Sequence, residues 1–254
     1  MSGLSSETVV LLHGQPGSAA DWDLVCEDLH GVRVLARNRP GYDGRPAGGF
    51  DRNAVALLEL MDAAGIDRAV LAGYSWGAGV ALRAALDAPE RVSALALIAP
   101  VGSVTAFGFR DRLVGSGPST GLMPAVLRRF GPVLTPLVAA ATGSRLPAAA
   151  RHRLRRQVSA AAAESVWRTY RVEQVALSAE SAELESRLSE ISAPAEVLIG
   201  HRDRSVRPAA ARRLAELLPA ADLHEIDAGH LLLLEAPAAV AATIRQAVRR
   251  SAPG

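Results

Sequence analysis

The sequence predicts an α/β fold with a mostly parallel central sheet of about six strands, helices on both faces and an inserted helical cap. Short apolar runs alternate with helical patterns through most of the chain, which is typical of repeated βα units. The 254 residues are 49% hydrophobic, enough to bury one substantial core. One long stretch in the middle of the chain breaks the alternation and carries no convincing strand.

Residues 1–100 alternate between apolar runs and helical patterns. We expect strands at residues 8–12, 32–36, 69–72 and 93–98, and helices at about 19–29, 52–64 and 77–88. Ser18 is placed to cap the first of these helices. Residues 37–49 form a loop rich in Pro and Gly, and the whole stretch is predicted to be the first part of an α/β core.

The stretch 101–189 is predicted to be a helical cap inserted into this core. It opens with Gly/Pro/Ser-rich sequence and then becomes rich in Ala, Arg and Glu. An ordinary run of sheet-covering helices is the alternative interpretation. The alternation resumes in residues 190–254, the second part of the core, with strands at 196–199 and 223–226 and helices at 209–218 and 238–249.

The composition limits the kinds of partner and the cellular compartment that we expect for this protein. All 28 basic residues are arginine, yet the formal net charge is only +2, which argues neither for nor against a polyanionic partner. We expect no nucleic-acid partner. Cys26 is the single cysteine and is predicted to be a buried small hydrophobe, so neither an intrachain disulfide nor a cysteine metal cluster is expected. No apolar run reaches the roughly 18 residues of a membrane span, and the N-terminus lacks the apolar region of a signal peptide. We therefore expect a cytoplasmic protein with no membrane partner, no metal and no other cofactor.

The strongest chemical signal is Gly73-Tyr74-Ser75-Trp76-Gly77, which places a serine between an expected strand and an expected helix. A nucleophile on such a tight turn needs a strained backbone, and glycines two residues before and after it remove Cβ atoms that would crowd the turn. Small residues at the start of the following helix allow close packing on the sheet. Ser75 is therefore the candidate nucleophile, against the alternative of a glycine-rich turn with an incidental serine.

A serine hydroxyl is a poor nucleophile unless a base takes its proton. Of the six histidines, His230 is the best placed, because it follows Ala228-Gly229 in a loop after the last expected strand. Asp203 follows the preceding strand and is the candidate acid that orients His230. Asp227 is the rival acid, but only three residues before His230 it has little room to reach across the imidazole.

In this Ser-Asp-His order, and over nearly the whole chain, the sequence resembles the α/β-hydrolase family. His13-Gly14-Gln15-Pro16-Gly17 looks like the family's oxyanion loop, and Gly229-His230 followed by Glu235-Ala236-Pro237 looks like its histidine loop. The resemblance implies that the backbone N–H groups of Gln15 and Trp76 form the oxyanion hole. It also implies that the first histidine of the oxyanion loop supports that loop rather than reacting.

Three further expectations follow from the resemblance. Arg39-Pro40-Gly41-Tyr42 resembles the loop after the family's next strand and is expected to shape the rim of the site in a structural role. Only about seven residues precede the first strand, where the family has an extra antiparallel hairpin, so we expect a trimmed sheet of six parallel strands. The strand at 32–36 then becomes an edge, which we expect the N-terminal residues or the second subunit of a homodimer to cover.

Substrate contacts are predicted beside the nucleophile and in the cap. Tyr74 and Trp76 flank Ser75, although helix packing is an equal alternative for the Trp76 indole. Nine arginines and one acid lie between Arg110 and Arg156, a net charge of +8. Arg110 and Arg112 come soonest after the fourth strand and are candidates for attracting an anionic substrate, whereas a solvated helix face is the ordinary alternative.

Together the residues and the resemblance predict a serine hydrolase that cleaves a carboxylic ester or a related acyl bond of a small-molecule substrate. Ser75 attacks the carbonyl, His230 takes its proton, and Asp203 holds the imidazolium until water releases the acyl group. The serine excludes the alkyl-enzyme ester chemistry of enzymes of this fold with an aspartate nucleophile. The same residues suit thioester, lactone or C–C bond hydrolysis, aminopeptidase action or cofactor-free perhydrolysis. A triad-bearing small-molecule receptor with little turnover is the alternative outside enzymes.

Overall fold

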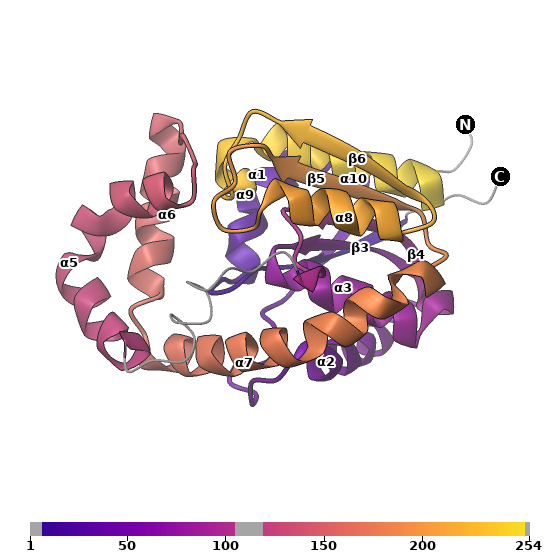
Figure 1. Ribbon diagram of the computed structural model, residues 1–254, viewed down its shortest axis with the longest axis horizontal. Helices are drawn as coiled ribbons and strands as arrows, with labels where there is room; N and C mark the ends of the chain where they lie inside the picture. The colour runs from indigo at the N-terminus through magenta and orange to yellow at the C-terminus, as the bar shows by residue number, and fades with distance from the viewer. Residues whose placement is uncertain (1–6, 105–118, 252–254) are drawn as a thin grey trace.

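Six parallel strands form one sheet through the centre of the molecule, in the order β2-β1-β3-β4-β5-β6 (Figure 1). The structure is a computed structural model, which describes residues 7–104 and 119–251. The strands are Thr8–Leu12 (β1), Arg33–Ala36 (β2), Ala69–Tyr74 (β3), Val92–Ile98 (β4), Ala195–Gly200 (β5) and Ala221–Ile226 (β6). The prediction of six parallel strands is confirmed, and each predicted strand ends within two residues of an observed one.

Burial explains why these segments form strands. Every residue of β1, β3, β4 and β5 is buried, and their sequences are rich in Val, Leu, Ile and Ala, as parallel strands covered on both faces require. β2 and β6 lie at the two edges and are partly exposed. The expected cover of the β2 edge stays a prediction, because residues 1–6 lie outside the described residues.

Helices cover both faces of the sheet (Figure 1). α3 (Trp76–Asp87) and α8 (Pro208–Leu217) pack on one face, with α2 (Phe50–Ala63) against α3. α10 (Pro237–Ser251) and the short α1 (Asp23–Cys26) lie on the other face. Three further short helices complete the core: η2 (Pro89–Arg91), η4 (Leu188–Glu190) and α9 (Leu232–Glu235). Because all six strands are parallel, the loops that leave their carboxyl ends reach the same edge of the sheet, where sites of α/β folds form.

The prediction of one continuous helix over residues 19–29 is wrong. The structure has a 3₁₀ turn, η1 (Ala19–Trp22), and a single α-helical turn, α1, after which the N–H groups of Asp28 and Leu29 bond to carbonyls three residues back. The Trp22 side chain is fully buried, so the tight turn seats it in the core. Cys26, at the end of α1, is half-buried rather than buried as predicted.

In the described part of the segment between β4 and β5, where the sequence predicts a helical insertion, the structure has three α-helices: α5 (Ser119–Ala141), α6 (Ala148–Ala160) and α7 (Glu164–Arg187). They are called the cap helices below. α5 and α6 stand to one side of the sheet, at the left of Figure 1, and α7 runs back along the core toward β5. An apolar cluster that includes Leu127, Leu154 and Leu234 packs α5 and α6 together and against α9. The division of the chain into core and cap units remains a prediction.

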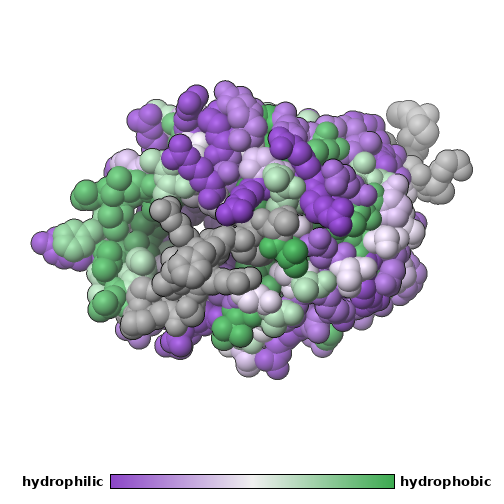
Figure 2. Space-filling model, in the orientation of Figure 1, coloured by the Kyte–Doolittle hydropathy of each residue, from purple (hydrophilic) through white to green (hydrophobic). Residues whose placement is uncertain are grey.

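The outer face of α5 is apolar (Figure 2). Its exposed side chains recur every three or four residues: Leu122, Val126, Phe130, Val133 and Leu137. The opposite side of the helix packs on α6, so α5 carries apolar side chains on both its inner and its outer side, with Arg128 and Arg129 exposed between them. Even so, no helix within residues 7–104 and 119–251 is long and apolar enough to cross a membrane.

Candidate active site

Ser75 stands on a sharp turn between β3 and α3. Its backbone has φ 51° and ψ −116°, a region that residues with a Cβ atom rarely adopt. A Cβ on Gly73 would lie 2.5 Å from the Ala78 Cα, and one on Gly77 would lie 2.3 Å from the Leu12 carbonyl oxygen. Neither position has room for a larger residue, which is the crowding that the sequence pattern predicts.

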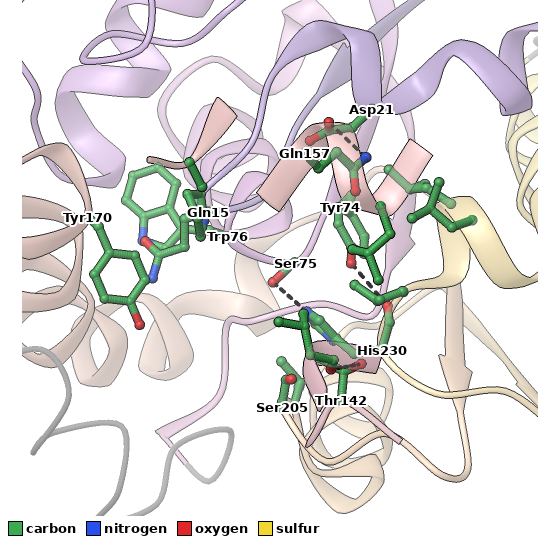
Figure 3. A pocket seen from close by; sticks show the side chains of 18 of the residues that line it. Gln15, Asp21, Tyr74, Ser75, Trp76, Thr142, Gln157, Tyr170, Ser205 and His230 are labelled. Carbon is green, nitrogen blue, oxygen red and sulfur yellow. Dashed lines mark hydrogen bonds between the residues drawn. The ribbon is translucent and has the colours of Figure 1, made fainter. Parts of the chain in front are cut away.

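His230 lies between Ser75 and Asp203. Its Nε2 is 3.1 Å from the Ser75 Oγ (Figure 3), and its Nδ1 is 2.7 Å from Asp203 Oδ2. The second carboxylate oxygen of Asp203 accepts the backbone N–H groups of Ser205 and Val206, each at 2.8 Å. The Asp203 side chain is fully buried. A carboxylate held in this way keeps the proton of His230 on Nδ1, so that Nε2 is free to accept the proton of Ser75.

The backbone around His230 is held by the core and by the segment that follows α5. The Tyr74 hydroxyl donates to the His230 carbonyl at 3.1 Å (Figure 3). The His230 N–H donates to the Thr142 carbonyl, and the next N–H, that of Leu231, donates to the Ser144 hydroxyl, both at 3.0 Å. These contacts leave the loop that carries His230 little freedom to move away from Ser75.

Asp227, the rival acid, has other partners. It is 66% exposed, and its carboxylate pairs with Arg202 and lies 3.1 Å from His201 Nε2. The structure therefore brings together the serine, the histidine and the aspartate that the sequence favours. Of the remaining histidines, His224 pairs with the buried Glu196 at 2.6 Å, and His30 and His152 are exposed.

Gln15 and Trp76, whose backbone N–H groups the resemblance assigns to an oxyanion hole, both line the cavity beside Ser75. Trp76 is the first residue of α3, so its N–H has no acceptor within the helix. Gln15 follows β1 and lines the same cavity as Ser75. Donors at these two positions flank the serine from two different loops.

Hydrogen bonds of the His13 and Arg39 side chains support the oxyanion loop, residues 13–17. Both are buried: His13 Nδ1 donates to the Gly14 carbonyl at 2.9 Å, and its Nε2 accepts the backbone N–H of Arg39 at 3.0 Å. Burial, and next the charge of Arg39, hold the pKa of His13 well below its usual value, so the ring stays neutral. Within the loop Arg39–Tyr42, which is expected to shape the rim of the site in a structural role, the Arg39 side chain is only 2% exposed and donates to the carbonyls of His13 and Gly14. Arg39 itself is therefore a buried support and does not lie at the rim.

A cavity of about 400 Å³ opens over Ser75 and His230 (Figure 3). The core supplies one side of it, and the three cap helices supply the other through residues such as Val138, Leu154 and Trp167. A cavity of this size suits a small molecule. Within the described ranges, no three His, Cys, Asp or Glu side chains gather as a metal site would require.

The two aromatic residues beside Ser75 both line the cavity (Figure 3). The ring centroid of Tyr74 is 5.4 Å from that of His230. The Trp76 indole is fully buried between Phe50, 4.7 Å away between ring centroids, and the Arg39 guanidinium, 4.4 Å from the ring centroid. Trp76 therefore packs in the core and also borders the cavity, and contact of either residue with substrate stays a prediction.

The basic stretch of the cap is only partly described. Arg110 and Arg112 fall in residues 105–118, outside the described residues, so their expected role toward an anionic substrate stays a prediction. Arg153 pairs with Asp23 and Glu27 of the core at 3.4 and 3.3 Å. The other arginines of α5, α6 and their connection are exposed, as the solvated-face alternative expects: Arg128, Arg129, Arg145, Arg151, Arg155 and Arg156.

The pairing of Asp21 with Gln157 beside the cavity is not predicted by the sequence. Gln157 on α6 donates its Nε2 to Asp21 Oδ1 at 3.0 Å (Figure 3), and the Ser18 N–H donates to Asp21 Oδ2 at 2.9 Å. Burial raises the pKa of the Asp21 carboxyl to about 6. The only available signal is Ser18 as a helix cap, since an acid three residues later completes a capping box. Nothing in the sequence pairs that acid with the cap helix.

The sequence model of the α/β hydrolase fold matches residues 7–237, and the chain therefore belongs to the α/β hydrolase fold family. Solved structures with the same fold include a thermophilic esterase from Thermogutta terrifontis, with a TM-score of 0.75 and 23% identity over 96% of this chain and 90% of that one. Another is Est816, an N-acyl homoserine lactone degrading enzyme, with a TM-score of 0.73 and 22% identity over 94% of this chain and 92% of that one. At these identities the likeness shows the fold alone.

Curated proteins match shorter stretches at higher identity. The 2-hydroxy-6-oxo-6-phenylhexa-2,4-dienoate hydrolase of Comamonas testosteroni is 35% identical over 106 residues, 38% of this chain and 37% of that enzyme. A dihydrolipoyllysine-residue acetyltransferase component of the acetoin cleaving system from Cupriavidus necator is 37% identical over 132 residues, 50% of this chain and 33% of that protein. The chain thus spans about a third of the length of these relatives, 37% of the first and 33% of the second.

Proposed function

We propose that this protein is a serine hydrolase that cleaves a carboxylic ester or a related acyl bond through an acyl-enzyme intermediate. The observation that carries the proposal is the continuous hydrogen-bonded series from Asp203 through His230 to Ser75, which ends at the wall of a cavity for small molecules. The strained backbone of Ser75 supports it, because strain of this kind concentrates where a side chain must be presented to a reactant.

The geometry supports the following sequence of steps. Ser75 Oγ attacks the carbonyl carbon as its proton passes to His230 Nε2, and Asp203 stabilises the imidazolium that forms. The N–H groups of Gln15 and Trp76 stabilise the oxyanion, an interaction whose loss costs about 10²–10³ in kcat for a single donor in comparable sites. His230 then protonates the leaving group. Water attacks the acyl-enzyme with His230 as base, and the free acid and Ser75 are released.

The curated relatives favour a second candidate within the same chemistry. Several of them are hydrolases of 2-hydroxy-6-oxo-dienoates, from Comamonas testosteroni and Burkholderia cepacia among others. A substrate of this class carries a carboxylate, which agrees with the anionic substrate that the basic cap predicts. An incubation with 2-hydroxy-6-oxo-6-phenylhexa-2,4-dienoate, in which the absorbance of this compound is recorded over time, separates this candidate from a simple esterase.

The proposal is tested with a fluorophosphonate probe and a short p-nitrophenyl ester. We expect a covalent phosphonyl adduct that peptide mapping places on Ser75, steady release of p-nitrophenol, and loss of both in Ser75→Ala. Tight binding of a small molecule with negligible turnover would instead support the receptor alternative. An adduct on another residue, with Ser75→Ala still active, would overturn the assignment of the nucleophile.

A further inference from the structure

Arg39 and Glu173 form a buried ion pair between the core and a cap helix. Arg39 lies in the loop after β2 and Glu173 lies on α7; Nη1 and Oε1 are 2.5 Å apart, and the side chains are 2% and 0% exposed. Two neighbouring hydrogen bonds hold the same junction, from the Tyr42 hydroxyl to Glu173 Oε2 at 2.8 Å and from the Thr169 hydroxyl to the Gly41 carbonyl at 2.9 Å. Removing either charge of the pair would leave the other buried and unpaired.

Arg39 Nη1 also donates to Asn53 Oδ1 at 3.2 Å, and the other two nitrogens of the guanidinium donate to the oxyanion loop. Nε donates to the His13 carbonyl at 2.9 Å, and Nη2 donates to the Gly14 carbonyl at 2.8 Å. The Gly14 carbonyl and the Gln15 N–H belong to one planar trans peptide group, in which they point in opposite directions. Whatever fixes the direction of that carbonyl therefore also fixes the direction of the Gln15 N–H.

The same guanidinium also contacts the residue of the second expected donor. Its carbon lies 4.4 Å from the ring centroid of Trp76, whose backbone N–H begins α3. The loop that Arg39 holds lies close to the nucleophile, since a Cβ on Gly14 would be 3.2 Å from the Ser75 Cβ. One buried cation thus contacts both loops that flank Ser75, and its carboxylate partner comes from the cap.

We propose that Glu173 is a positioning residue, which acts through Arg39 to keep the Gln15 N–H directed at the oxyanion that forms on Ser75. The inference rests on the proposed function, because the direction of this N–H matters only if an oxyanion forms. Docking of α7 then completes the catalytic site as well as lining the cavity. Without the carboxylate, the guanidinium loses its only buried counter-ion among the described residues, and only neutral acceptors remain to hold it beside the loop.

The test compares Glu173→Gln with Glu183→Gln. Glu183 is a matched control because it also joins α7 to a core arginine, Arg83, at 3.0 Å, but it is 51% exposed. The other acidic partners of Arg83 among the described residues are Asp51 and Asp87, which do not belong to the oxyanion loop. We expect Glu173→Gln to lower kcat about 10-fold or more, with KM changed by less than about threefold. Arg39→Lys should do the same, because lysine keeps the charge but cannot span both carbonyls. Glu183→Gln should leave both constants unchanged.

A transition-state analogue separates positioning from anchoring of the cap. A trifluoromethyl ketone forms a tetrahedral adduct with its oxygen in the oxyanion hole, so its inhibition constant should rise in Glu173→Gln by the same factor by which kcat falls. The double variant with Arg39→Lys should lose no more than the worse single variant, because the two residues act through one another.

Three outcomes would overturn the inference or its basis. If Glu173→Gln lowers Tm or raises KM but keeps kcat and the inhibition constant, Glu173 only anchors the cap and the inference fails. If Ser75→Ala stays active, the proposed function itself fails, which is a distinguishable result. Should Glu173→Gln not fold, Tyr42→Phe removes one hydrogen bond to the same carboxylate; a fall of about twofold or more in kcat at constant KM supports the inference, and an unchanged kcat overturns it.

Discussion

His230 Nε2 lies 3.1 Å from Ser75 Oγ, although 155 residues separate the two along the chain. The parallel sheet makes this contact possible, because the loops that follow β3 and β6 emerge at the same edge. Asp203 reaches the same place from the loop after β5. Three loops at one edge of the sheet thus hold Ser75 and Asp203 each within hydrogen-bonding distance of His230.

The three side chains should act as one unit. We expect Ser75→Ala, Asp203→Asn and His230→Ala each to lower esterase kcat by roughly 10³-fold or more, while the far-UV circular dichroism stays that of the wild type. Asp227→Asn is the matched control, since its carboxylate is exposed and pairs with Arg202. Near wild-type turnover in Asp203→Asn, together with loss in Asp227→Asn, would show that the acid is wrongly assigned.

Gly77, two residues after Ser75, should contribute strongly to the stability of the fold. In Gly77→Ala the new Cβ would meet the Leu12 carbonyl oxygen at 2.3 Å, so strand or helix must shift. We expect urea unfolding to show a loss of roughly 2–4 kcal/mol in the free energy of unfolding. In the control Gly65→Ala, the Cβ meets nothing within 4 Å, and only the φ of 62° is unfavourable, a cost of about 1 kcal/mol. Equal losses in both variants would contradict the crowding argument.

The Asp21 carboxyl should make stability depend on pH between about 4 and 6. Its pKa is raised by burial to about 6 in the folded protein, whereas an unfolded Asp titrates near 3.9, so the folded state holds the proton over this interval. The contribution is therefore favourable below the unfolded pKa and is lost as pH rises through the folded one. We expect the free energy of unfolding of the wild type, minus that of Asp21→Asn, to be about 1 kcal/mol larger at about pH 5 than at about pH 7.5. A difference independent of pH would mean that the carboxyl is not desolvated.

The basic cap should favour anionic substrates if its arginines face the cavity. We expect kcat/KM for an anionic ester to fall with added salt more steeply than for a matched neutral ester, because the Debye length is only about 10 Å at 0.1 M salt. Arg110→Ala and Arg112→Ala should reduce that difference, and Arg129→Ala, an exposed residue of α5, is the control. The same salt response for both esters in every variant would leave these arginines as solvated surface.

Local patterns in the sequence predict which three side chains the folded chain brings together, but not the residues that support them. The Gly73–Gly77 pattern, the strand ends and the order of Ser75, Asp203 and His230 are local or follow from a parallel sheet, so they can be derived from the residues. The role of Arg39 cannot, because its partner Glu173 lies 134 positions later on a helix whose docking only the folded chain defines. The same holds for the contact of Asp21 with Gln157.

Whether a helix continues or breaks also cannot be predicted from the sequence where contacts between distant elements determine it. Residues 19–29 have a helical pattern, yet seating Trp22 in the core breaks them into a 3₁₀ turn and one α-helical turn. α9 is too short for any periodicity to reveal. In both places the backbone is set by contacts between distant elements, which override the local pattern.

The most direct test of the account is the mass of the intact protein during turnover of a slowly deacylating p-nitrophenyl ester. An acyl-enzyme predicts a burst of p-nitrophenol close to one equivalent and a protein heavier by one acyl group, with the modified peptide containing Ser75. In Ser75→Ala both the burst and the added mass should vanish. Steady hydrolysis by the wild type with no burst and no added mass, or an acyl group on a residue other than Ser75, would contradict the account.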